Sequence, residues 1–84
     1  MLTRYLAQEF GNRRIRVNAI SPGPIRTELG GELNDEFESL LASRAALGRV
    51  GEPDDVADVI TSLLTHETRW VNAQTIEVTG GFAL

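Results

Sequence analysis

The 84-residue sequence contains no cysteine and no lysine, and its apolar runs are short. Without cysteine, the chain can form no disulfide, no thiolate zinc site and no thiol nucleophile. No stretch approaches the ~18 apolar residues of a membrane-spanning helix, and the start lacks the apolar segment of a secretion signal. We therefore expect a cytoplasmic chain that has no membrane partner.

Charge is distributed unevenly along the chain, whose net charge is −4. All eight basic residues are arginines; residues 1–27 carry five of them against one acid, whereas residues 28–58 carry nine acids against two arginines. Nucleic-acid binders need a clustered basic face, so the acidic balance predicts no nucleic-acid partner. Arg13, Arg14 and Arg16 follow a predicted helix, and we interpret them as offsetting its dipole. We interpret the acidic residues of 28–58 as lying at the solvated starts of helices and not in a metal site.

Apolar spacing predicts three helices. The first covers residues 1–10 and stops at Gly11, and the second is capped at residues 34–36 and closes at Gly48. The third begins at Pro53, with two aspartates at the positive end of its dipole. It has the strongest amphipathic pattern of the three, carried by Val56, Val59, Ile60, Leu63 and Leu64.

Two segments have strand patterns. Residues 15–20 are rich in β-branched side chains and end at the Ser-Pro-Gly-Pro run 21–24, which we expect to continue neither strand nor helix. Residues 75–79 alternate and stop at a Gly-Gly turn, 80–81. The order helix–strand–helix–helix–strand predicts an α/β fold with one right-handed crossover between two parallel strands. Parallel sheets normally contain more strands, so we interpret the chain as the trailing part of a larger doubly wound sheet.

Four pieces of the chain resemble, in order and spacing, the C-terminal half of the short-chain dehydrogenase/reductase family. They are the helix segment 2–9 beginning LTR, the run RVNAISPGPIRT (16–27), the run GRVGEPDDVA (48–57) and the closing VTGG (78–81). Residues 1–84 are accordingly identified as a partial Rossmann-like domain. The resemblance implies an NAD(P)-dependent oxidoreductase that acts on the alcohol or carbonyl group of a small molecule and forms a homo-oligomer. It leaves the choice between NAD and NADP open.

The resemblance also implies a cofactor site at Pro22, Gly23, Ile25 and Thr27. In the family, this Pro-Gly loop lies against the nicotinamide; the backbone of Ile25 would bind the carboxamide, and Thr27 would add its hydroxyl. Residues 29–48 resemble the substrate-binding loop and its helix. Independently, ligands of parallel sheets bind outside the carboxyl ends of the strands, where this loop lies. Taken alone, the Ser-Pro-Gly-Pro run favours a simple strand-ending turn, and the surrounding pieces of the resemblance favour the cofactor loop instead.

The chemistry of the family needs residues that this sequence does not contain. No Gly-x-x-x-Gly-x-Gly motif occurs, and the single tyrosine, Tyr5, has Glu9 four residues later where the family has lysine. A carboxylate there cannot replace the lysine cation that general-base catalysis by a tyrosine needs. We therefore predict no catalytic residue and no metal ligand in this chain, and no turnover by the isolated chain.

Other candidate residues have structural interpretations. Tyr5 is predicted to pack, the sole histidine, His66, to cap the preceding helix, and Trp70 to lie in the core or at a subunit contact. Ala73 and Thr79 stand where the family commonly has glycine and aspartate.

Two alternatives to the oxidoreductase portion stay open. The chain could be a stand-alone, non-catalytic protein that dimerises through its unpaired strand, or a remnant without stable function.

Overall fold

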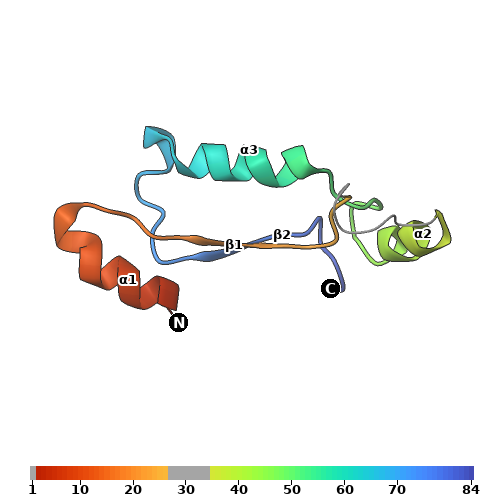
Figure 1. The fold of residues 1–84 in the computed structure, drawn as a ribbon, viewed down its shortest axis with the longest axis horizontal. Coiled ribbons are helices and arrows are strands. Elements are labelled where there is room, and N and C mark those ends of the chain that lie inside the picture. The colour runs from red at the N-terminus through yellow and green to blue at the C-terminus, as the bar shows by residue number, and fades with distance from the viewer. Residues whose placement is uncertain (1, 27–34) are drawn as a thin grey trace.

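Two parallel strands form the centre of the chain in the computed structural model, which describes residues 2–26 and 35–84 (Figure 1). Strand β1 (Ala19–Pro22) pairs with β2 (Thr75–Val78) from Ala19 opposite Thr75 to Pro22 opposite Val78. The helices are α1 (Leu2–Phe10), η1 (Gly11–Arg13), α2 (Asp35–Ser43), α3 (Pro53–Leu63) and η2 (His66–Thr68). The predicted α/β class, with three α-helices and a two-stranded parallel sheet, is confirmed.

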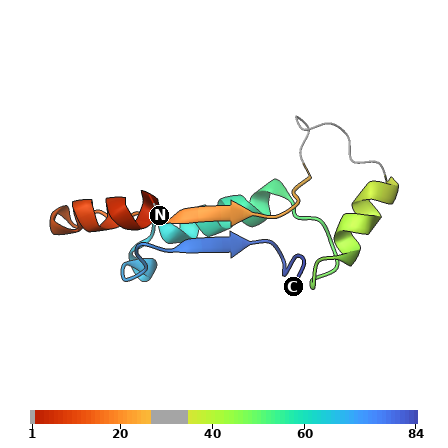
Figure 2. The same cartoon turned by 90° about the horizontal axis from the view of Figure 1, so that it is seen from below.

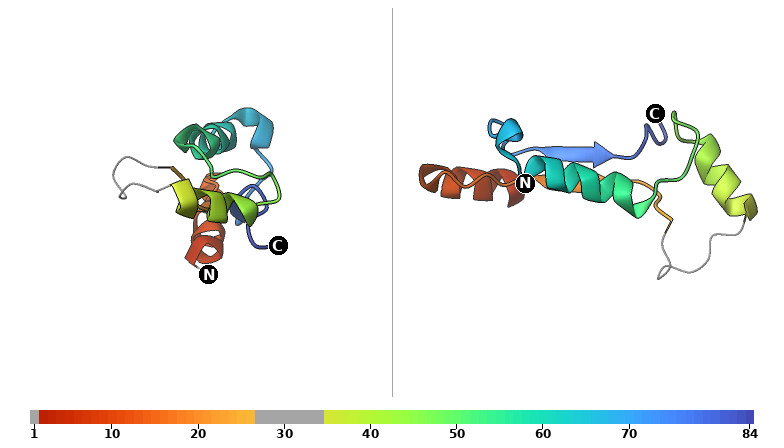
Figure 3. Two further views of the ribbon diagram at one scale, coloured as in Figure 1. Left: turned by 90° about the vertical axis from the view of Figure 1, so that its right-hand side faces the viewer. Right: turned by 90° about the horizontal axis from the view of Figure 1, so that it is seen from above.

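The elements extend along the strand direction, in a molecule of about 49 × 22 × 21 Å. Helix α3 runs along one face of the sheet, and α1 lies near the amino ends of the strands (Figure 1). Helix α2 lies at the other end, beyond the carboxyl ends of β1 and β2 (Figures 2 and 3). None of the helices in the described residues is long and apolar enough to span a membrane.

The first strand begins four residues later than predicted. Before it, residues 17 and 18 bond to the turn that precedes β2. The N–H of Val17 donates to Oδ1 of Asn72 (3.0 Å), its carbonyl accepts from the N–H of Ala73 (2.9 Å), and Nδ2 of Asn18 donates to the carbonyl of Val71 (3.1 Å). Because β2 begins only at Thr75, residues 15–18 lie beyond the reach of its ladder.

The prediction that the Ser-Pro-Gly-Pro run cannot continue a strand is wrong for its first two residues, because Pro22 ends β1. The N–H groups of Ala19 and Gly23 donate to β2 and its flank, at the carbonyls of Gln74 (2.8 Å) and Val78 (3.1 Å). Backbone groups alternate between the two edges of a strand, so the nitrogen of Pro22 lies on the edge away from β2. Proline is tolerated there because no ladder bond is lost.

Arg16 has a different role from the predicted one. Its guanidinium donates to the carbonyls of Leu63 (2.7 Å), Thr68 (3.0 Å) and Val71 (3.1 Å), and so ties the start of the β1 segment to the end of α3. Arg16 therefore caps α3 and not α1. His66 makes no side-chain hydrogen bond to the helix carbonyls in the described residues: the Leu63 carbonyl accepts from Arg16, and the Ser62 carbonyl accepts from the hydroxyls of Thr65 and Thr68.

The second helix ends at Ser43, five residues before the predicted stop at Gly48. Beyond it the chain pairs with the C-terminal segment: Ala46 donates to the carbonyl of Gly81 (2.9 Å) and Leu47 to that of Gly80 (3.0 Å). These bonds replace the last helical turns. The predicted cap at Asn34 lies outside the described residues. The third helix begins at Pro53 as predicted.

Few side chains are buried among the described residues: Ala7, Ala45 and Val50 make up the buried apolar set. Tyr5 is 65% exposed and Trp70 is 95% exposed, so the predicted packing of Tyr5 and a core position for Trp70 are wrong. Leu2 and Leu64 are also largely exposed. A sheet of two strands, with one helix along it, offers these side chains no apolar partner.

Ala73 occupies a left-handed backbone conformation, with φ of 61°. A Cβ atom is strained there, which gives a physical reason for glycine at this position in the family. We predict that Ala73→Gly stabilises the chain by about 1 kcal/mol. The control is Ala57→Gly, the same change in the exposed middle of α3, which should destabilise by about 1 kcal/mol. Urea unfolding followed by circular dichroism measures both; a loss of stability in Ala73→Gly contradicts the prediction.

Candidate functional site

The loop that follows β1 packs closely against the residue that follows β2. The N–H of Gly23 donates to the carbonyl of Val78 (3.1 Å). A Cβ atom on Gly23 would lie 3.0 Å from Cβ and 3.1 Å from Cα of Thr79. The backbone atom of this pair cannot move aside as a flexible side chain can. Glycine is therefore favoured at position 23, because any larger residue would push Thr79 away from the loop.

Ile25 presents an unpaired backbone edge. Residues 24–26 run parallel to Gly51, whose N–H donates to the carbonyl of Pro24 (3.0 Å) and whose carbonyl accepts from the N–H of Arg26 (2.8 Å). In such a bridge, the N–H and C=O of the central residue point to the other side. Within the described residues, neither group of Ile25 has a hydrogen-bond partner. The loop thus holds one free donor and one free acceptor on a single residue.

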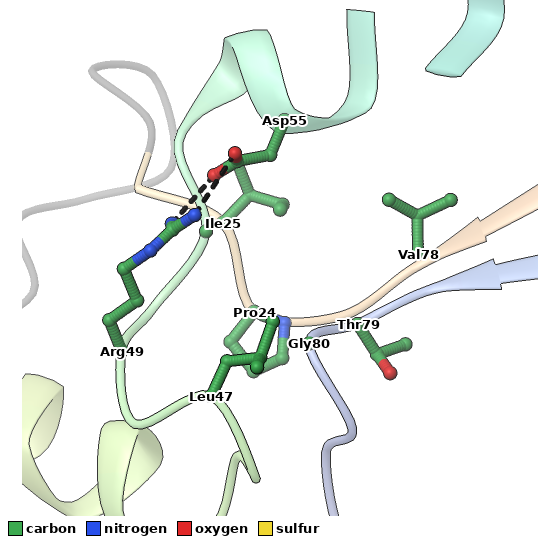
Figure 4. A pocket seen from close by; sticks show the side chains of 9 residues that line it. Pro24, Ile25, Leu47, Arg49, Asp55, Val78, Thr79 and Gly80 are labelled. Carbon is green, nitrogen blue, oxygen red and sulfur yellow. Dashed lines mark hydrogen bonds and ion pairs between the residues drawn. The ribbon is translucent and has the colours of Figure 1, made fainter. Parts of the chain in front are cut away.

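A hollow of about 200 Å³ adjoins this loop. It is lined by Pro24, Ile25, Leu47, Arg49, Gly51, Asp55, Val78, Thr79 and Gly80. Arg49 and Asp55 are joined at one side with Ile25 beside them, while Leu47 lies near Pro24 and Gly80 (Figure 4). Ligand pockets usually measure about 300–1,000 Å³, so this space fits only a small group or a side chain.

Asp55 is the most strongly perturbed titratable group that the structure describes. Both guanidinium Nη atoms of Arg49 donate to its carboxylate, at 2.7 and 3.1 Å, and the N–H of Glu52 donates to it at 2.7 Å. These bonds, with that of Arg49 the largest cause, lower the pKa of Asp55 to about 2. The carboxylate also raises the pKa of Arg49. The pair forms one side of the hollow, and Asp55 lies in the first turn of α3. Both groups stay charged near neutral pH, so neither can exchange protons there.

Arg26 forms a second ionic group beside the loop. It pairs with Glu38 of α2 and, at 3.0 Å, with Glu52, which precedes α3. The hydrogen bond to Glu38 is the largest cause of the raised pKa of Arg26.

The structure separates the predicted site residues. Ile25 lines the hollow; Pro22 lies within β1 and Gly23 against Thr79, both outside the lining. Thr27 lies outside the described residues, as do residues 29–34 of the predicted substrate segment. Residues 35–48 of that segment form α2 and the turn after it.

Tyr5 does not belong to this site, since α1 lies at the opposite end of the sheet (Figure 2). No cluster of three or more potential metal ligands occurs in residues 2–26 and 35–84.

The sequence did not predict roles for Arg26, Arg49 and Gly51. Asp55 was placed at a helix start but not in an ion pair. The sequence does contain one signal for Asp55. Asp55 is the third residue of α3, the position from which a carboxylate can accept a hydrogen bond from the N–H of the residue that precedes the helix, Glu52. Arg26 gave no such signal, because its partners are 12 and 26 residues away in the chain.

Comparisons with known proteins assign the family. The family model described as enoyl-(acyl carrier protein) reductase matches residues 1–83. The 3-oxoacyl-(acyl-carrier-protein) reductase of Thermotoga maritima is 39% identical over 83 residues, which cover 99% of this chain and 34% of that protein.

Solved structures agree. The 3-oxoacyl-(acyl-carrier-protein) reductase from Brucella melitensis is 36% identical, with a TM-score of 0.91. The matched region covers 99% of this chain and 31% of the reductase chain. 4-Hydroxyisoleucine dehydrogenase, solved as a complex with NADH, is 39% identical, with a TM-score of 0.86. The matched region covers 95% of this chain and 34% of the dehydrogenase chain. The chain belongs to the short-chain dehydrogenase/reductase family and corresponds to the C-terminal portion of its members. It spans about a third of the length of these relatives.

The pKa of Asp55 leads to a pH prediction. A carboxyl whose pKa is lowered on folding contributes stability above its ordinary value, about 4, and that contribution is lost as the pH falls toward about 2. Asp55→Asn should lower the melting temperature at pH 7 and flatten the loss of stability between these pH values. Asp58→Asn, on the exposed side of α3, is the matched control. Carboxyl titration by NMR measures the pKa directly, and a value near 4 for Asp55 contradicts the prediction.

Proposed function

We propose that this chain is the C-terminal third of an NAD(P)-dependent oxidoreductase acting on a small alcohol or carbonyl compound. The family is established by the comparisons above. The observation that carries the cofactor role is the unpaired N–H and C=O of Ile25, on a loop at the carboxyl edge of the sheet. Related structures solved with NADH or NAD support a nicotinamide cofactor for the whole protein.

The free edge of Ile25 matches the nicotinamide carboxamide, which offers one acceptor and two donor hydrogens in a plane. The residue is held on both sides, since Gly51 bonds to Pro24 and Arg26. Such fixed groups bind a planar amide without a large loss of loop entropy. When bound, the nicotinamide would supply hydride transfer, and this chain would hold the ring in place.

Pro22 and Gly23 act on the cofactor indirectly in this proposal. Pro22 fixes the end of β1, and Gly23 allows the loop to lie against Thr79. The hydroxyl of Thr27 would add a further contact. Helix α2 would lie on the substrate side.

Acid–base catalysis would come from residues outside this chain, so we propose that the isolated 84 residues turn over no substrate. Exposed side chains such as Leu64 and Trp70 support contact with further protein, either the remainder of the domain or a second copy. The competing proposal, a stand-alone protein that dimerises, predicts a stable dimer indifferent to nicotinamide cofactors.

A chimera tests the proposed function. Residues 1–83 replace the matching third of the Thermotoga maritima reductase, with which they share 39% identity. We expect the chimera to reduce a 3-oxoacyl thioester at no less than about one-hundredth of the parent rate, since misplacement by about 1 Å costs roughly that factor. The isolated chain, and the parent enzyme truncated before this third, should be inactive. A folded chimera without turnover, or activity of the isolated chain, contradicts the proposal.

The role of Ile25 has its own test in the same chimera. Ile25→Pro removes the N–H without breaking any hydrogen bond in the described structure, and should weaken NAD(P)H binding by about tenfold, the effect of one lost hydrogen bond. Ile25→Val keeps the backbone donor and serves as the control, with less than about a twofold effect. Fluorescence titration measures the affinities. Equal binding by both variants would show that the N–H is not used.

A further inference from the structure

Arg26 joins three segments that are distant in the sequence. It follows Ile25 directly, and its guanidinium carries two separate partners. One terminal nitrogen, Nη2, donates to Oε1 of Glu38 in the first turn of α2, and the other, Nη1, lies 3.0 Å from Oε1 of Glu52 at the start of α3. The side chain therefore bridges the loop, α2 and α3.

Helix α2 has little packing to determine its position. None of its residues is buried, and no helix or strand of the described structure packs extensively against it. Its C-terminal end is connected to the chain beyond β2, because Ala46 and Leu47 donate to the carbonyls of Gly81 and Gly80. Its N-terminal end is where Glu38 meets Arg26. The helix is thus fixed by backbone bonds at one end and reached by an ion pair at the other.

Exposed ion pairs are weak, and this determines what the bridge can do. Arg26 and Glu38 have side-chain exposures of 56% and 24%, so solvent screens their attraction. Such a pair changes the ratio between two orientations of a helix, one with the pair formed and one without it, by roughly two- to fivefold. That factor is negligible for a packed helix, but it decides the orientation of a helix whose alternatives differ little in buried surface.

We propose that Arg26 is a positioning residue that holds α2 against the Pro24–Arg26 loop by pairing with Glu38 while Glu52 keeps the guanidinium in place. The consequence for catalysis, that α2 is oriented on the substrate side of the nicotinamide loop, rests on the proposed function. The positioning itself does not. Arginine suits this role because its planar fork presents two terminal nitrogens to two acids at once, whereas lysine has one.

The absence of cysteine permits a direct measurement on the full 84-residue chain. Spin labels at Ser39→Cys on α2 and Ala57→Cys on α3, both exposed positions, report the distance between the two helices by pulsed electron resonance. We expect one dominant distance in the otherwise unchanged chain. Arg26→Gln and Glu38→Gln should each reduce its population by roughly two- to fivefold. Arg4→Gln on α1 removes the same charge from a side chain without a partner in the described structure, and should change nothing.

Three further measurements separate a specific pair from general loosening. The double variant Arg26→Gln/Glu38→Gln should match either single variant, because the pair is already broken. Arg26→Lys should recover part of the dominant population. Salt at about 1 M, where the Debye length is about 3 Å, should reduce that population in the parent chain and leave the double variant unchanged.

The proposal is overturned if Arg26→Gln gives the same distance distribution as the parent chain, whether both are narrow or both are broad. It is also overturned if Glu38→Gln has no effect, or if the effects of the two single changes add in the double variant. Because these readouts need neither cofactor nor substrate, an inactive chimera would count against the proposed function alone.

Discussion

Two main-chain hydrogen bonds, from Gly51 to Pro24 and from Arg26 to Gly51, hold the loop after β1 in a fixed path. A Cβ atom at position 51 would lie 2.6 Å from Cδ1 of Ile25, the flexible end of that side chain, so a larger residue there would require the Ile25 side chain to move while the backbone bridge stays in place. The bridge turns the edge of Ile25 outward and brings Arg26 to its two acidic partners. The free backbone pair and the ionic bridge to α2 are therefore consequences of one contact between segments 26 residues apart.

The rest of the molecule contributes little buried surface. A parallel sheet is normally covered on both faces, but here Trp70, Leu64 and Tyr5 remain largely exposed. The predominant interactions are instead directional: the three carbonyl bonds of Arg16, the Asn18 and Asn72 side-chain bonds, and the pairing of residues 45–47 with 80–82. Hydrogen bonds of this kind specify geometry, whereas apolar burial supplies most of the free energy of folding. The chain thus has a well-defined local path with a small core, which supports the proposal that it works within a larger domain.

Local patterns predicted the fold well where the information was local. The amphipathic spacing and Pro53 located α3 correctly, and the Gly-Gly pair marked the end of β2. Long-range partners caused the errors. Residues 15–18 have strand-like composition but lack a ladder partner, and α2 stops at Ser43 because residues 46 and 47 bond to the C-terminal segment. Arg16 resembles a helix-end cation of α1 in sequence, yet its guanidinium reaches carbonyls 47–55 residues away. Only the folded path reveals such partners.

Thr79 shows how this chain departs from the family without losing the turn. Its hydroxyl accepts from the N–H groups of Gly81 and Phe82, both at 3.2 Å, which is the capping role that an aspartate carboxylate can perform in the same position. Thr79 also lines the hollow that contains Asp55. Because the side-chain oxygen at position 79 bonds to these two N–H groups, an aspartate there would direct its carboxylate to the same turn and leave the Arg49–Asp55 pair unchanged.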